Sequence, residues 1–180
     1  MAGAFAELDR LREWRVVVDA RECRQIAHRT DGCGETDIPS GVDALQTWLR
    51  AWRPHAVVIH LGHNGRMGSE DFDILMTNTA GVSTVVWLTL AQPQKWRTSN
   101  NDVIRDGVAR WRQASLLDWC ELSAGQPWFR SDGLHLERAG AVALANVLAE
   151  ALIAQKWPLR LALARGGPRR AARERRARLT

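Results

Sequence analysis

The sequence predicts an α/β fold in which helices cover a mostly parallel sheet on both faces. Short runs rich in Val, Ile and Leu alternate with longer helical patterns, and this alternation is typical of βαβ units. The predicted strands are Arg15–Asp19, His55–Leu61, Val82–Leu90 and Ala114–Trp119. Ligands bind at the carboxyl ends of the strands in such sheets, so we expect a site in the loops that follow these runs.

Four stretches between and after these runs have apolar residues at helical spacing. The predicted helices cover residues 42–52, 69–79, 100–112 and 136–155. Ser40 and Ser69 are placed to cap the first two, and Pro158 is expected to end the last one. The helical stretches complete the βαβ pattern.

The chain of 180 residues is most simply one domain, which we place at residues 1–160, followed by an Arg-rich tail at 161–180. Residues 165–180 hold seven Arg and one Glu, and the other 164 residues hold 18 basic and 19 acidic side chains. The body is therefore close to neutral, which argues against a specific nucleic-acid-binding domain. The tail could contact phosphates or an anionic membrane surface, or it could be a solvated terminus.

The beginning of the chain, MAGAFAELDRLREW, has early acids and no apolar core, so we expect no signal peptide, and no apolar run has the length of a membrane span. As it stands the sequence indicates a cytoplasmic protein; a domain excised from a longer chain could belong to the cell envelope. Cys23 and Cys33 could close a disulfide loop in an exported protein or remain free thiols in the cytosol. Since the His residues lack metal-ligand spacing, we expect no metal site.

The loop after the second predicted strand reads GHNG, from Gly62 to Gly65. Glycines allow a sharp turn and close approach of the backbone to a ligand, and the amide of Asn64 is a suitable neutral donor to an oxyanion. The alternative is that Asn64-Gly65 is a simple turn dipeptide.

The stretch SDGLHLERAG places Asp132 three residues before His135, just ahead of the last predicted helix. A carboxylate at this spacing can accept from Nδ1–H of the imidazole and leave Nε2 to act as a base. The alternative is a turn at Asp132-Gly133 followed by a helix start.

In this order, VVVDA, VVIHLGHNG and SDGLHLERAG resemble the SGNH (GDSL-like) hydrolase superfamily, particularly bacterial domains found alone or attached to membrane acyltransferases. The resemblance runs from about Trp14 to Leu152. It implies a flavodoxin-like three-layer α/β/α sandwich that hydrolyses or transfers acyl groups of a small-molecule or glycan ester, without metal or organic cofactor.

By the same resemblance each block supplies part of one site. Asp132 would be the orienting acid and His135 the general base, while Asn64, with Gly62 and Asp19, would belong to the oxyanion and substrate-binding part. The family's second block supplies another loop Gly, for which Gly32 and Gly34 are both candidates.

The first block departs from the family at the nucleophile. The family has Gly-Asp-Ser where this chain has Val18-Asp19-Ala20, so a methyl group occupies the position of the attacking hydroxyl and the acyl-enzyme route is closed there. Cys23 is one helical turn away and is more simply a structural cysteine, whereas His135 could activate water directly.

Three hypotheses follow. The chain is an esterase or O-acyltransferase domain whose nucleophile has been replaced by Ala20 through engineering. Alternatively, Ala20 is natural, and the domain is a pseudoenzyme or water-activating remnant that binds an acylated glycan or lipid. In the third, the chain is an adaptor that binds anionic surfaces through its tail, and removal of residues 165–180 would abolish that function alone.

Overall fold

The computed structural model describes residues 14–164, with side chains through residue 154, and its centre is a parallel three-stranded sheet. The strands are β3 (Ala56–Ile59), β4 (Thr84–Leu88) and β5 (Ala114–Leu117), in the order β3-β4-β5. The register pairs Ile59 with Trp87 and Trp87 with Leu116. Three of the predicted strands are therefore confirmed, and all three end at one edge of the sheet.

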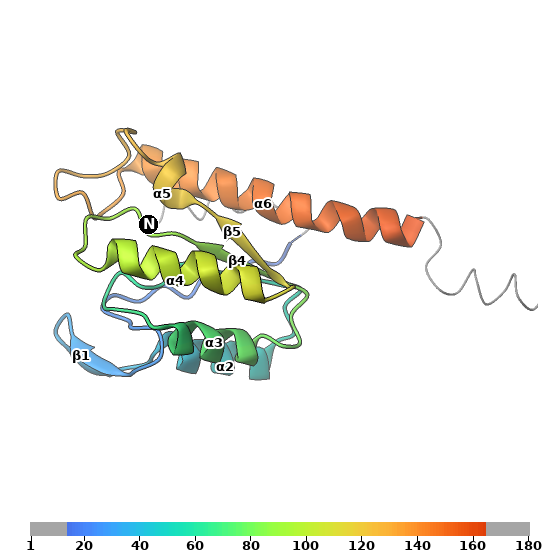
Figure 1. Cartoon of the computed structure of the whole chain (residues 1–180), viewed down its shortest axis with the longest axis horizontal. Coiled ribbons are helices and arrows are strands. Elements are labelled where there is room, and N and C mark those ends of the chain that lie inside the picture. The colour runs from blue at the N-terminus through green and yellow to red at the C-terminus, as the bar shows by residue number, and fades with distance from the viewer. Residues whose placement is uncertain (1–13, 165–180) are drawn as a thin grey trace, which may run out of the picture.

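Helices cover both faces of this sheet, as predicted for a three-layer α/β/α fold (Figure 1). Val85 and Trp87 of β4 point into a core shared with α2 (Gly41–Ala51), α3 (Ser69–Asn78) and α4 (Arg97–Arg110). Val86 and Leu88 point the other way, toward α5 (Trp119–Leu122) and α6 (Arg138–Ala164). The alternation of β4 between two apolar cores is what a strand buried on both faces requires.

The helix termini differ in detail from the sequence predictions. Ser40 caps α2 as expected, and its hydroxyl and the Asp43 carboxylate form a reciprocal capping box. Ser69, however, is the first residue of α3, and the cap is Gly68, whose N–H donates to the Asp71 carboxylate at 2.8 Å. The carboxylate in the first turn thus satisfies the N–H of the cap residue, and no side chain at the cap accepts from the helix.

The predicted strand Arg15–Asp19 is wrong: this segment has no strand pairing, and its three valines are exposed by 40–45%. A β-branched run favours a strand only where a neighbouring chain completes the ladder. The chain instead forms an unpredicted antiparallel hairpin of β1 (Thr30–Gly32) and β2 (Glu35–Ile38). The two residues between them, Cys33 and Gly34, both have positive φ, as a type I′ turn needs.

Two further expectations concern the end of the chain. Pro158 does not stop α6, which continues to Ala164; a proline removes one hydrogen bond of a helix and need not end it. Residues 165–180, which hold most of the predicted tail, lie outside the described residues.

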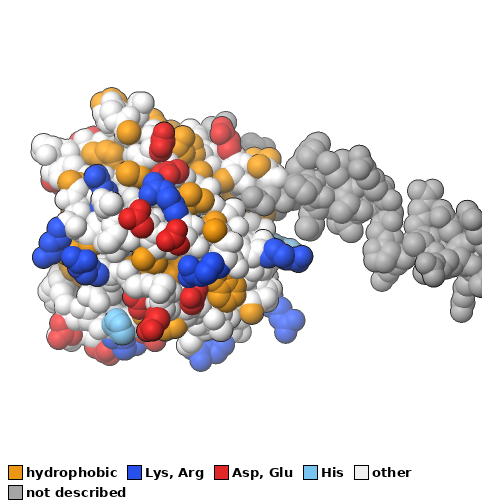
Figure 2. Space-filling model, viewed as in Figure 1, with side chains coloured by type: hydrophobic (Ala, Val, Ile, Leu, Met, Phe, Trp, Pro, Cys, Tyr) orange, Lys and Arg blue, Asp and Glu red, His pale blue; other side chains and the backbone are white. Residues whose placement is uncertain are grey.

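No helix within residues 14–164 has the length and apolar content needed to cross a lipid bilayer. On the face shown in Figure 2, basic and acidic side chains are interspersed.

Candidate functional site

The loop before α6 brings Asp132 and His135 into direct contact. Asp132 Oδ2 lies 2.8 Å from His135 Nδ1, and Oδ1 accepts from the backbone N–H groups of Leu134 and His135 at 2.7 and 2.9 Å. The hydrogen bond with the His135 ring, followed by the two backbone donors, holds the pKa of Asp132 far below its usual value. The carboxylate is thus ionised and fixed in place. Its hydrogen bond uses Nδ1 of His135, so Nε2 takes no part in the contact between the two residues.

A short antiparallel turn supports this pair. Phe129 bridges to Leu136, the Arg130 N–H donates to the His135 carbonyl at 2.8 Å, and the Glu137 N–H donates to the Trp128 carbonyl at 2.8 Å. Trp128 in turn stacks on the buried Trp119, with ring centroids 5.4 Å apart. The Asp132–His135 pair is solvent-exposed, but the turn that carries it packs against the apolar core on the α5 and α6 face of the sheet.

The loop after β3 is held from the start of α4. Nδ2 of the fully buried Asn100 donates to the carbonyls of Gly62 and Gly65 at 3.0 and 2.8 Å, and its Oδ1 accepts from the Met67 N–H at 2.9 Å. Trp96 Nε1 donates to the Gly62 carbonyl at 3.1 Å as well. Gly62 has a φ of 114°, a region that favours glycine, so the loop needs this residue as well as these partners.

Asn64 lies in this loop with an exposed side chain. Its Nδ2 donates to the Arg24 carbonyl at 3.1 Å, which fixes the orientation of the amide and leaves its second N–H available. A water-sized hollow of about 10 Å³ adjoins Asn64 and Gly62 and is bordered on its other side by residues 25–28. The geometry is that of an oriented amide donor beside a small space.

Asp19 and Ala20 are linked to this loop through a buried arginine. Nη1 of Arg24, whose side chain is 8% exposed, lies 2.9 Å from Asp19 Oδ1, and Trp48 Nε1 donates to Asp19 Oδ2 at 2.8 Å. Ala20 follows Asp19 and is exposed. Among the described residues, no hydrogen bond or ion pair joins Asp132 or His135 to Asn64, Asp19 or Ala20.

The loop after β4 lies between the Asn64 loop and the turn that carries Asp132 and His135. A Cβ built on Gly62 would lie 3.1 Å from Leu90, and one built on Gly133 would lie 3.3 Å from Pro93. Leu90 and Pro93 belong to the same loop, so the Asn64 loop and the Asp132–His135 turn both pack against it. The structure thus brings these two elements to one edge of the sheet, as the strand ends predict.

The Cys23–Cys33 disulfide ties the residue before Arg24 to the hairpin turn. The sequence left this pairing open, and the structure forms it. The hairpin also accounts for the two other glycines of interest, since Gly32 lies in β1 and Gly34 forms the turn in open space. A Cβ built on Gly32 would meet Cys23, and one built on Gly34 would have no atom within 4 Å, so neither points at Asn64.

His60 and His63 form a partly buried pair that follows β3, with ring centroids 4.6 Å apart. Burial is the main cause that lowers both pKa values, that of His60 well below its usual value; the neighbouring His63 adds to the effect on His60, and the Gln92 side chain opposes it at His63. Both rings are therefore neutral near pH 7. Within the described residues, no group of three or more His, Cys, Asp or Glu is arranged to hold a metal ion.

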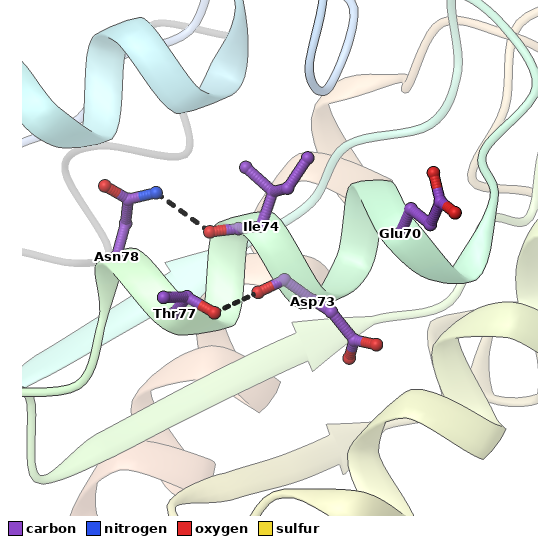
Figure 3. A pocket seen from close by; sticks show the side chains of 5 residues that line it. All are labelled: Glu70, Asp73, Ile74, Thr77 and Asn78. Atoms are coloured by element: carbon purple, nitrogen blue, oxygen red, sulfur yellow. Dashed lines mark hydrogen bonds between the residues drawn. The ribbon is translucent and has the colours of Figure 1, made fainter.

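A second hollow, of about 450 Å³, lies along the outer surface of α3 (Figure 3). Its polar groups are partly satisfied by the helix itself: Thr77 donates to the Asp73 carbonyl and Asn78 to the Ile74 carbonyl, both at 2.8 Å. The Asp73 carboxylate already accepts from Arg110 and Trp111. This surface has few free groups to recognise a ligand.

Three residues that support the candidate site were not predicted from the sequence: Arg24, Trp96 and Asn100. Arg24 lies in a polar stretch of the sequence, and Asn100 lies in the polar first turn of α4, so neither has a sequence signal for burial. Only the tertiary fold reveals their contacts.

Comparison with known proteins relates the chain to acetyltransferases. No family model matches it. Over 97 residues the chain is 29% identical to the O-acetyltransferase OatA of Staphylococcus aureus strain NCTC 8325. It is 31% identical over the same length to a protein of S. aureus strain COL that is provisionally named an O-acetyltransferase. The match covers 53% of this chain and 16% of each relative, so the chain corresponds to a small part of these proteins.

Proposed function

We propose that this chain carries an SGNH-type acyl-ester site, acting on an acetyl or related ester of a small molecule or glycan, in which Ala20 stands at the nucleophile position. The observation that carries the proposal is the Asp132–His135 pair at 2.8 Å, in which the His135 ring and then two backbone donors hold the carboxylate ionised. The similarity to O-acetyltransferases supports acyl transfer as the reaction class.

In this proposal Asp132 holds the His135 ring in the tautomer that protonates Nδ1, and Nε2 acts as the base. Without a hydroxyl at residue 20, water is the nucleophile: its oxygen attacks the ester carbonyl carbon while its proton passes to Nε2. Asn64 donates to the developing oxyanion together with the backbone at Gly62. Collapse of the intermediate breaks the bond to the alcohol oxygen, which takes the proton from His135, and a carboxylic acid and an alcohol leave.

A second function is favoured by one observation, the methyl group of Ala20. A site that retains an oriented amide and a His–Asp pair but lacks the attacking oxygen can bind an acylated glycan or lipid without turning it over. Asp19 would then help to shape the binding site through Arg24 and Trp48.

The test is hydrolysis of p-nitrophenyl acetate by the unchanged chain and by Ala20→Ser. We expect Ala20→Ser to gain at least about 100-fold in kcat/KM, because a covalent route is then open. His135→Ala in that background should remove the gain. If neither the unchanged chain nor Ala20→Ser hydrolyses the ester above the rate in solvent, the esterase proposal fails and the binding function becomes the better one.

A further inference from the structure

The start of α4 presents two consecutive asparagines that are almost completely buried, Asn100 and Asn101, with exposures of 0% and 3%. Buried amides are costly unless their donors and acceptors are all paired, so such residues mark positions where the backbone needs side-chain partners. Each of these two serves a different loop at the carboxyl edge of the sheet.

Among the described residues, the side chain of Asn100 forms hydrogen bonds only to the loop that contains Asn64. Both N–H groups of its amide are used, one for the Gly62 carbonyl and one for the Gly65 carbonyl, and its oxygen accepts from Met67 N–H. The three bonded backbone groups flank Asn64 on both sides. The side chain therefore fixes the path of the backbone around Asn64 without touching the Asn64 amide itself.

Asn101 makes the same kind of contact to another loop. Its Oδ1 accepts from the Leu90 N–H at 2.7 Å and its Nδ2 donates to the Leu90 carbonyl at 2.9 Å. It is the neighbouring residue on the same helix, is similarly buried, and has no bond to the Gly62–Met67 loop among the described residues. The chain thus supplies its own matched control.

We infer that Asn100 is a positioning residue for the oxyanion donor: it holds the Gly62–Met67 loop in the one conformation that presents the second N–H of Asn64 to a substrate. This inference rests on the proposed acyl-ester function for its catalytic part and on the three hydrogen bonds for its structural part. Trp96 assists, because its indole N–H shares the Gly62 carbonyl with Asn100.

The experiment compares Asn100→Leu with Asn101→Leu, each in the full chain and in the Ala20→Ser background. Leucine keeps a similar volume and removes every hydrogen bond of the amide. Amide hydrogen exchange measures the loops, and p-nitrophenyl acetate hydrolysis measures the site. We expect Asn100→Leu to speed exchange of the Met67 amide at least about ten-fold and Asn101→Leu to speed that of Leu90 instead.

For catalysis, we expect Asn100→Leu to lower kcat of Ala20→Ser by about 100-fold with little change in KM, as loss of an oxyanion donor does. Asn101→Leu should lower kcat much less. Unchanged exchange at Met67, or equal losses of kcat in both variants, would overturn the inference. If Ala20→Ser is itself inactive while the exchange changes as expected, the proposed function fails and only the loop-holding part of the inference stands.

Should Asn100→Leu fail to fold, Trp96→Phe provides a milder version. It removes one of the two side-chain donors to the Gly62 carbonyl and leaves the other in place. We expect kcat of the Ala20→Ser background to fall by about three- to ten-fold in this variant. A kcat that stays the same would overturn the claim that the hydrogen bonds to the Gly62 carbonyl hold this loop for catalysis.

Discussion

The loop Gly62–Met67 and the segment Arg15–Ala20 are restrained in very different ways, although Arg24 contacts both. The loop follows a strand of the sheet and accepts two hydrogen bonds from the buried Asn100 side chain of α4. The segment has no strand pairing and exposes three valines. The proposed oxyanion half of the site is thus part of the scaffold, whereas the half with the proposed nucleophile position depends on Asp19, Arg24 and the neighbouring disulfide.

Among the substitutions, the largest effect should come from removing that disulfide. We expect Cys23→Ser with Cys33→Ser to lower the free energy of unfolding by about 3 kcal/mol, since the cross-link closes a short loop in the unfolded chain. Urea unfolding measures this, and trypsin cleavage after Arg15 and Arg21 should become faster. Cys120→Ser, at the free cysteine, is the control. Equal stability and cleavage in the double variant would show that the disulfide does not restrain the segment.

Gly62→Ala should come next, with a loss of about 2 to 3 kcal/mol. The substitution strains the backbone at positive φ and brings a methyl group to within 3.1 Å of Leu90 and 3.3 Å of the Asn100 amide. Gly34→Ala is the matched control, because its φ is also positive but no atom lies within 4 Å of the added carbon. We expect about 1 kcal/mol there, and similar losses in both variants would mean that the loop is not tightly packed.

Acid should destabilise the fold through His60 and His63. Burial lowers both pKa values from 6.5, so below about pH 6.5 the unfolded chain binds protons that the folded chain does not. Stability should therefore fall as the pH drops below that point, by up to about 1.4 kcal/mol per pH unit for each histidine. Urea titrations from pH 7 to 4.5 measure the slope. His60→Asn should flatten it, and an unchanged slope would assign the effect to other groups.

The smallest effect is expected in the exposed segment itself. Val17 is 41% exposed, and Val85 in β4 is fully buried. Val17→Ala should change the free energy of unfolding by less than about 0.5 kcal/mol, whereas Val85→Ala should cost about 2 kcal/mol or more. A loss at Val17 comparable to that at Val85 would indicate that Arg15–Asp19 is packed as a strand in solution.

Much of the fold could be predicted from the sequence, because local pattern and tertiary environment agree there. The run Val82–Leu90 is apolar on both of its alternating faces, and β4 is indeed buried on both. The run Arg15–Asp19 is as rich in β-branched residues, but composition alone does not reveal whether a neighbouring strand is available. The hairpin was missed because its turn residue Cys33 has a positive φ that cysteine rarely adopts.

The candidate site could be predicted less completely. The spacing of Asp132 and His135 is local, so the sequence alone indicated their contact, and the structure has it. The support of Asn64 is not local: Arg24 and Asn100 lie about 40 and 36 residues away and contact it or its loop only after folding. Buried polar partners of this kind resemble ordinary surface residues in a sequence.

Covalent trapping tests the central claim most directly, namely that residue 20, His135 and Asn64 belong to one acyl-ester site. A p-nitrophenyl alkylphosphonate reacts with a serine that has been activated by a base. In Ala20→Ser, intact mass and peptide mapping should show one phosphonate at residue 20, and His135→Ala or Asn64→Ala in the same background should slow its formation at least about 100-fold. Failure of Ala20→Ser to form the adduct, or formation at the same rate without His135, would contradict the account.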